Sequence, residues 1–143
     1  MDLIRSYAPG FIFTTSVPPA TVAGALASVR HLYHSKEERQ MQQKVTKEVK
    51  ARLERGGIPV LPNPSHIVPV MVYDAELCKL ASDKLLVDHQ IYVQPINYPT
   101  VPMGEERLRI TPGPLHTPAM MDHLVSSLQT VWSELGMFFS SFF

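Results

Sequence analysis

Two arginines stand in a short alternating stretch near residue 108. Residues 107–110 read Arg-Leu-Arg-Ile, and this alternation predicts a strand that places both arginines on one face of a sheet. A guanidinium binds a carboxylate through two parallel hydrogen bonds and never loses its charge, so Arg109 could hold a carboxylate ligand. The spacing by itself favours the plainer interpretation, two solvated arginines on an exposed sheet face.

The segment before this strand, residues 97–106, has neither helical nor alternating periodicity. Pro99, Pro102 and Gly104 interrupt its backbone, so it is predicted to be a loop between two strands. Thr100 lies at its centre, and by itself this residue is a loop hydroxyl in water. A loop of this kind could also take two positions and close over a site.

Three further sets of polar residues are candidates for chemistry. Thr14 and Thr15 follow a predicted buried strand, where hydroxyl and backbone N–H groups could converge on a phosphate, although local capping is the commoner role of such a pair. His31 and His34 lack a third defined ligand, so no metal site is expected. His116 precedes a predicted helix, and nothing nearby in the sequence orients it as a base, which favours a polar loop residue.

Composition excludes several classes of function. The chain has 143 residues, 45% of them hydrophobic, and its 13 Lys and Arg balance 13 Asp and Glu. A net charge of zero supports no partnership with nucleic acid or anionic membrane. The single cysteine, Cys78, excludes an internal disulfide and is predicted to be a small core residue. The apolar segment 137–143 is far shorter than the roughly 20 residues that span a bilayer.

The predicted elements give an α+β chain with one modest core. In the first part of the chain, periodicity predicts the end of a helix at 2–8, a buried strand at Phe11–Phe13, and helices around 22–33 and 41–53. A strand follows at 67–72, where Pro69 indicates an edge position, and then a helix capped by Asp74. The last elements are strands at 91–93 and 107–111 and a helix opened by Thr117 and Pro118. This order predicts a short sheet with helices on one face.

Three sequence blocks resemble a known family. IRSYAPGFIFTTSVPP (residues 4–19), INYPTVP (96–102) and GEERLRITP (104–112) are similar to segments of the α-oxoamine synthases, which are pyridoxal-phosphate enzymes of fold type I. The likeness runs in one order from about residue 2 to residue 136, and NYPTVP favours the aminolevulinate branch of the family.

The resemblance implies a domain organisation. It assigns residues 1–16 to the end of a large cofactor-binding domain, 17–56 to connecting helices and 57–136 to a small C-terminal domain with a mainly antiparallel sheet. The apolar tail at 137–143 does not look like the family. The cofactor-binding lysine of the family lies upstream of the matching region, so no catalytic residue is expected in this chain and the chain is interpreted as a fragment.

The resemblance also implies a cofactor, substrates and site residues. In the family, threonines matching Thr14 and Thr15 reach the phosphate of pyridoxal 5'-phosphate from the neighbouring subunit of a homodimer. The residue matching Thr100 helps bind succinyl-CoA, and the arginine matching Arg109 holds the carboxylate of the substrate glycine. Met103 stands where many relatives have an arginine, which removes a charge from the loop.

The expected function is therefore that of a pyridoxal-phosphate-dependent acyltransferase in tetrapyrrole synthesis. The resemblance also implies a location in the mitochondrial matrix, with the targeting segment upstream of this chain. Two alternatives remain open from the sequence. The chain could be a non-catalytic module that pairs with full-length subunits, or it could belong to another α-oxoamine synthase.

Overall fold

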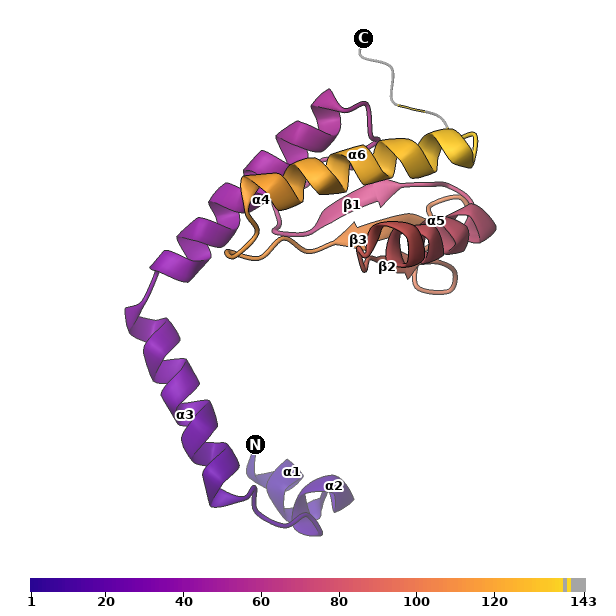
Figure 1. Ribbon diagram of the computed structural model, residues 1–143. Coiled ribbons are helices and arrows are strands. Elements are labelled where there is room, and N and C mark those ends of the chain that lie inside the picture. The colour runs from indigo at the N-terminus through magenta and orange to yellow at the C-terminus, as the bar shows by residue number, and fades with distance from the viewer. Residues whose placement is uncertain (138, 140–143) are drawn as a thin grey trace. The chain divides into compact units, whose positions relative to one another are not determined.

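The chain divides into two compact units, Met1–Lys36 and Glu37–Phe143 (Figure 1). The computed structural model describes residues 1–137 and 139. The first unit consists of α1 (Asp2–Tyr7), α2 (Pro9–Ile12) and α3 (Pro19–His34). The predicted domain bounds at residues 16 and 56 are not tested by this division and stay a prediction.

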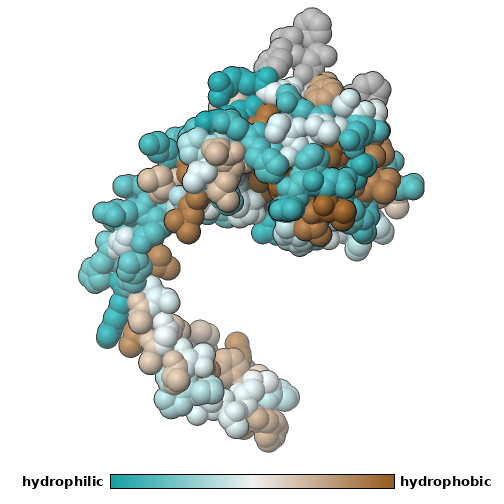
Figure 2. Space-filling model, in the orientation of Figure 1, coloured by the Kyte–Doolittle hydropathy of each residue, from teal (hydrophilic) through white to brown (hydrophobic). Residues whose placement is uncertain are grey.

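Every residue of the first unit is at least partly open to solvent. Figure 2 shows mainly white to tan residues over α1–α3, where the helices carry a mixture of small and apolar side chains. The exposed large apolar residues of this unit are Met1, Leu3, Ile4, Tyr7, Phe11, Ile12, Phe13, Val17, Val22, Leu26, Val29, Leu32 and Tyr33. Exposed apolar area on this scale is typical of a surface that another element or subunit covers.

The predicted buried strand at Phe11–Phe13 is wrong in this structure. Phe11 and Ile12 close the short helix α2, and Phe13 follows it with 83% of its surface exposed. Pro9 at the first helical turn favours the helix, since its missing N–H needs no partner there. A strand would need a hydrogen-bonded neighbour, and the first unit as described contains helices and connecting segments alone.

As far as its residues are described, the second unit is a three-stranded antiparallel sheet with three helices. Along the chain it contains α4 (Glu37–Arg55), β1 (Val68–Met71), α5 (Ala75–His89), β2 (Gln94–Ile96), β3 (Arg107–Ile110) and α6 (Pro118–Glu134). The strand order is β1-β3-β2, and β3 pairs antiparallel with both neighbours. The antiparallel sheet, and the edge position that Pro69 indicated for β1, are therefore confirmed.

One face of the sheet holds the core. Val68 lies opposite Ile110 and Val70 opposite Leu108, and all four side chains are buried. The helices cover this face with a continuous apolar layer whose buried members are Val45, Val49 and Leu53 of α4, Cys78, Ala81 and Leu85 of α5, and Met121, Leu128, Val131 and Trp132 of α6. The predicted arrangement, helices on one side of a short sheet, is confirmed.

Local signals set the ends of the helices. The Asp74 carboxylate accepts a hydrogen bond of 2.8 Å from the Leu77 N–H, and the Thr117 hydroxyl accepts one of 3.3 Å from the Met120 N–H. Both residues are the predicted N-caps, which satisfy backbone donors that the first helical turn leaves free. Gly57 follows α4 with φ of +75°, a conformation that ends a helix at little cost for glycine.

The second strand of the sheet was misplaced by the sequence pattern. The apolar run Ile91–Val93 predicted it, but β2 is Gln94–Ile96. Ile91 instead donates its N–H to the Leu85 carbonyl at 2.9 Å, which makes residue 91 part of the turn that ends α5. The buried Val93 carbonyl accepts a hydrogen bond of 2.7 Å from the Ser82 hydroxyl, so the run packs against the helix rather than pairing with β3.

Charged pairs connect α6 to the other two helices. Lys84 of α5 contacts Glu134 at 2.7 Å, and Arg52 of α4 contacts Asp122. Inside the layer Cys78 is fully buried, as predicted, and burial raises the pKa of its thiol, which keeps it protonated at neutral pH. Of the predicted apolar tail, only Met137 and Phe139 belong to the described residues, and Met137 packs against the core.

The register makes Leu108 the central core residue of the sheet. We expect Leu108→Ala to lower the free energy of unfolding of this unit by about 2 to 5 kcal/mol, because a cavity remains between β3 and the helices. Leu115→Ala, at a position 89% exposed, is the matched control and should change it by less than about 0.5 kcal/mol. Urea unfolding followed by the fluorescence of buried Trp132 measures both, and equal midpoints would contradict the assigned register.

Candidate functional site

Arg109 lies in the middle of the open face of the sheet. Its cross-strand neighbours are Pro69 on β1 and Gln94 on β2, and its side chain is exposed. Within the part of the chain that the structure describes, the ion pairs engage Arg107, which contacts Glu105 at 2.8 Å, and leave the Arg109 guanidinium without a carboxylate. Arg109 therefore keeps its fork of N–H donors available for an acidic ligand.

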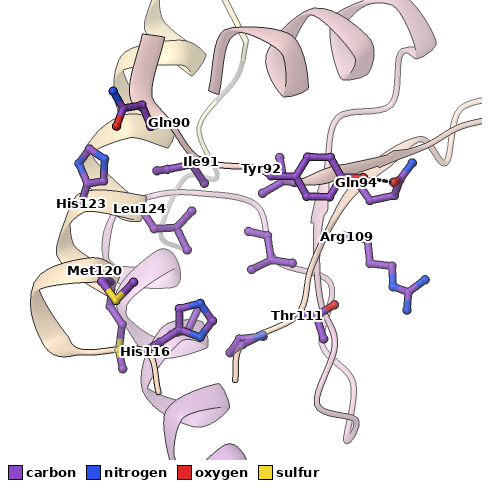
Figure 3. Close-up of a pocket in the computed structure, with 15 residues that line it drawn as sticks. Gln90, Ile91, Tyr92, Gln94, Arg109, Thr111, His116, Met120, His123 and Leu124 are labelled. Carbon is purple, nitrogen blue, oxygen red and sulfur yellow. Dashed lines mark hydrogen bonds between the residues drawn. The ribbon is translucent and has the colours of Figure 1, made fainter. Parts of the chain in front are cut away.

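Two polar side chains beside Arg109 were missed by the sequence reasoning. The Tyr92 hydroxyl donates a hydrogen bond of 2.6 Å to Gln94 Oε1, and Gln94 Nε2 donates one of 3.2 Å to the Pro95 carbonyl (Figure 3). The spacing of two between Tyr92 and Gln94 is the signal that could have found them, since residues i and i+2 of an extended segment share a face.

A cavity of about 550 Å³ opens beside this group. Figure 3 shows Tyr92, Gln94 and Arg109 on one side of it, and His116, Met120, His123 and Leu124 on the other. The remaining lining residues are Val49, Gln90, Ile91, Val93, Ile110, Thr111, Pro112 and Met121. The cavity therefore has a mainly apolar wall with polar groups at its rim, the arrangement typical of small-molecule sites.

His116 serves the backbone of the loop before α6. Its Nδ1 accepts a hydrogen bond of 2.7 Å from the Gly113 N–H, and the His116 N–H donates one of 3.2 Å to the Gly113 carbonyl. These contacts agree with the predicted role of a polar loop residue near a helix start.

The loop of residues 97–106 is held at its end next to β3. The Glu106 carboxylate accepts a hydrogen bond of 2.9 Å from the Gly104 N–H, and Gly104 has φ of +82°, a conformation that favours glycine. Thr100 lies at the exposed turn, where its N–H donates to the Asn97 carbonyl at 2.9 Å. The structure thus brings Arg109 to the rim of the cavity but does not include Thr100 in its lining.

Thr14 and Thr15 belong to the first unit, whereas Thr100 and Arg109 belong to the second. Both threonines are exposed, and the Thr14 hydroxyl donates a hydrogen bond of 2.9 Å to the Phe11 carbonyl. Local capping, the commoner role of a threonine pair, thus describes Thr14 here. Thr14 would have to break its hydrogen bond to the Phe11 carbonyl before its hydroxyl could donate to a phosphate.

Lysines and possible metal ligands are the other candidate groups among the described residues. No lysine lines the cavity, and Lys50 instead donates to the carbonyl oxygens of Asn63 at 2.8 Å and Ser65 at 3.0 Å. Among residues 1–137 and 139, no group of three or more His, Cys, Asp or Glu side chains is placed to hold a metal ion. None of the helices within that range is long and apolar enough to cross a membrane.

Sequence comparison shows the family of this chain. Residues 1–128 match the family described as aminotransferase class I and II. The mitochondrial 5-aminolevulinate synthase of Emericella nidulans is 61% identical over 137 residues, which cover 96% of this chain and 21% of that protein. The 5-aminolevulinate synthase of Rhizobium meliloti is 57% identical over 136 residues, which cover 95% of this chain and 34% of that protein.

The solved structures agree with the fold. The serine palmitoyltransferase of S. paucimobilis with a bound PLP–myriocin aldimine superposes with a TM-score of 0.82 at 29% identity, and the match covers 94% of this chain and 34% of that one. The predicted fold class, part of a fold-type I pyridoxal-phosphate enzyme, is confirmed. The chain thus spans between about a fifth and a third of the curated relatives it matches, and it belongs to the class I and II aminotransferase family.

Proposed function

We propose that this chain is the C-terminal part of a 5-aminolevulinate synthase, which condenses glycine with succinyl-CoA to give 5-aminolevulinate, CoA and carbon dioxide. The single observation that carries the proposal is Arg109, a guanidinium on the open sheet face, at the rim of a cavity and without a carboxylate partner among the described residues. Identity of 61% with a 5-aminolevulinate synthase, against 29% with a serine palmitoyltransferase, favours this branch of the family.

The cofactor of the proposed reaction is pyridoxal 5'-phosphate, which supplies an electron sink for the bonds broken at the glycine α-carbon. The donors of this chain fit the charged groups involved. The Arg109 guanidinium suits a carboxylate, and the exposed hydroxyls of Thr14 and Thr15 suit a phosphate. The lysine that attaches the cofactor in the family has no counterpart in this chain. In the proposal, Arg109, Thr14 and Thr15 therefore bind and orient the substrate and cofactor and form no covalent bond to them.

Arg109 orients the substrate. Two parallel N–H···O bonds fix both the position and the plane of the glycine carboxylate. The sheet fixes the backbone of Arg109 through strand pairing on both sides, so the side chain starts from a defined position on the open face. A substrate anchored in this way loses most of its rotational freedom before the chemical step, which is a large part of the benefit of an enzyme site.

The loop of residues 97–106 excludes water in the proposed mechanism. Thr100 at its exposed turn donates a hydroxyl hydrogen bond to succinyl-CoA when the loop closes. Closure removes water from the reacting groups and strengthens the hydrogen bonds inside the site. Met103, 76% exposed on the same loop, adds an apolar side chain to it.

A homodimer with shared sites is part of the proposal. The exposed apolar side chains of α1–α3 supply area for a subunit contact, and Thr14 and Thr15 follow α2 in the same unit. In this arrangement the two threonines reach the cofactor phosphate of the partner subunit. We also propose the mitochondrial matrix as the location, which the name of the Emericella nidulans relative supports and that of the Rhizobium meliloti relative does not address.

The first test replaces Arg109 in a complete enzyme that carries this chain. We expect Arg109→Lys to raise the Michaelis constant for glycine by about 10- to 150-fold, equivalent to about 1.5 to 3 kcal/mol, because lysine keeps the charge but loses the two parallel hydrogen bonds. Steady-state titration with glycine measures this effect. Arg55→Lys, at an exposed position on α4, is the matched control, and an unchanged Michaelis constant for Arg109→Lys would remove Arg109 from the site.

The second test asks whether the sites are shared. A subunit that lacks the catalytic lysine is mixed with one that carries Thr14→Val and Thr15→Val. If the threonines act on the partner's cofactor, one site of each mixed dimer has both its lysine and its threonines intact, and each mixed dimer has about half the activity of the unmodified dimer. An equal mixture that exchanges subunits at random then reaches about a quarter of that activity. Mixtures no more active than the separate homodimers would show that the threonines serve their own chain.

A further inference from the structure

We propose that Gln94 is a second substrate-binding residue beside Arg109, and that Tyr92 is the positioning residue that orients its amide. This inference rests on the proposed function and adds to it a donor on the neighbouring strand. In the described residues Gln94 is the direct cross-strand partner of Arg109, so the two side chains leave the same face of the sheet from adjacent strands.

The register places these side chains within reach of one small ligand. Residues directly opposite each other on antiparallel strands have Cβ atoms about 4.5 to 5.5 Å apart. Both side chains are exposed, and Figure 3 shows them on the same side of the cavity. On the other side of Arg109 the opposing residue is Pro69, which offers no side-chain donor. Gln94 is therefore the cross-strand neighbour of Arg109 that can supply a second hydrogen bond.

The hydrogen bonds of Gln94 determine which part of its amide is left for a ligand. Its oxygen accepts from the Tyr92 hydroxyl at 2.6 Å, and one N–H donates to the Pro95 carbonyl at 3.2 Å. A primary amide has two N–H donors, so one remains. A carboxylate has lone pairs for about four hydrogen bonds, and a bidentate arginine uses two of them. The remaining Gln94 N–H suits a third.

Tyr92 makes this arrangement specific. The terminal torsion of a glutamine side chain is broad, so an unrestrained amide presents its oxygen and its nitrogen almost equally. The Tyr92 hydroxyl donates to the amide oxygen and thereby turns the N–H groups away from itself. An oxygen directed at a substrate carboxylate would repel it. Tyr92 thus favours carboxylate binding without touching the substrate.

The experiment uses the complete enzyme and measures the dissociation constant of glycine from the change in cofactor absorbance, together with Michaelis constants for both substrates. We expect Gln94→Leu to weaken glycine binding about tenfold and Tyr92→Phe about threefold, the losses of one charge-assisted hydrogen bond and of one neutral hydrogen bond. The Michaelis constant for succinyl-CoA should not change. In the Gln94→Leu background, Tyr92→Phe should have no further effect, because Tyr92 acts through Gln94.

Matched controls are Gln43→Leu on α4 and Tyr73→Phe after β1, both at exposed positions, which should bind glycine as the unmodified enzyme does. If Arg109→Lys weakens glycine binding but Gln94→Leu does not, this inference is wrong and the proposed function stands. If neither variant affects glycine, both fail. A Gln94→Leu effect confined to succinyl-CoA, or independent and additive effects of Tyr92→Phe and Gln94→Leu, would also overturn the inference.

Discussion

The burial of Leu108 and Ile110 under three helices is the constraint on which the rest of the second unit depends. β3 is the central strand, so its alternation is enforced by pairing on both sides. Once these two side chains face the helices, Arg107 and Arg109 must face away from them. The burial of two apolar residues thereby determines which groups Arg109 meets, namely Pro69 and Gln94, and why its guanidinium is open to solvent.

The parts of this fold that could be predicted from sequence are those fixed by neighbours along the chain. Asp74 and Thr117 cap helices because their side chains reach backbone N–H groups three residues on. Pro69 indicates an edge strand because it lacks a donor for the ladder. The alternation of residues 107–110 identifies the face of Arg109. In each case the physical cause lies within four residues of the signal.

The remaining features depend on contacts between distant residues. Ile91–Val93 has the composition of a strand, but the Val93 carbonyl accepts a hydrogen bond from the Ser82 hydroxyl of α5. Pairing with β3 begins only at Gln94. Phe11 and Ile12 lie in a helical turn, which satisfies its own backbone hydrogen bonds. A strand at this position would need a neighbouring strand, and the described residues of the first unit contain none. The cavity gathers side chains from α4, β3 and α6, and no pattern in one segment indicates such a space.

Anchors at both ends limit the proposed movement of the loop. At its start the Asn97 side chain donates a hydrogen bond of 3.1 Å to the Ala75 carbonyl at the beginning of α5. At its end the Glu106 carboxylate accepts from the Gly104 N–H, and the Glu106 carbonyl accepts from the backbone after β1. Movement without breaking these bonds is confined to residues 98–103. Thr100 lies in the middle of that span, so closure of the loop in the proposed mechanism is a displacement between fixed ends rather than an opening of the sheet.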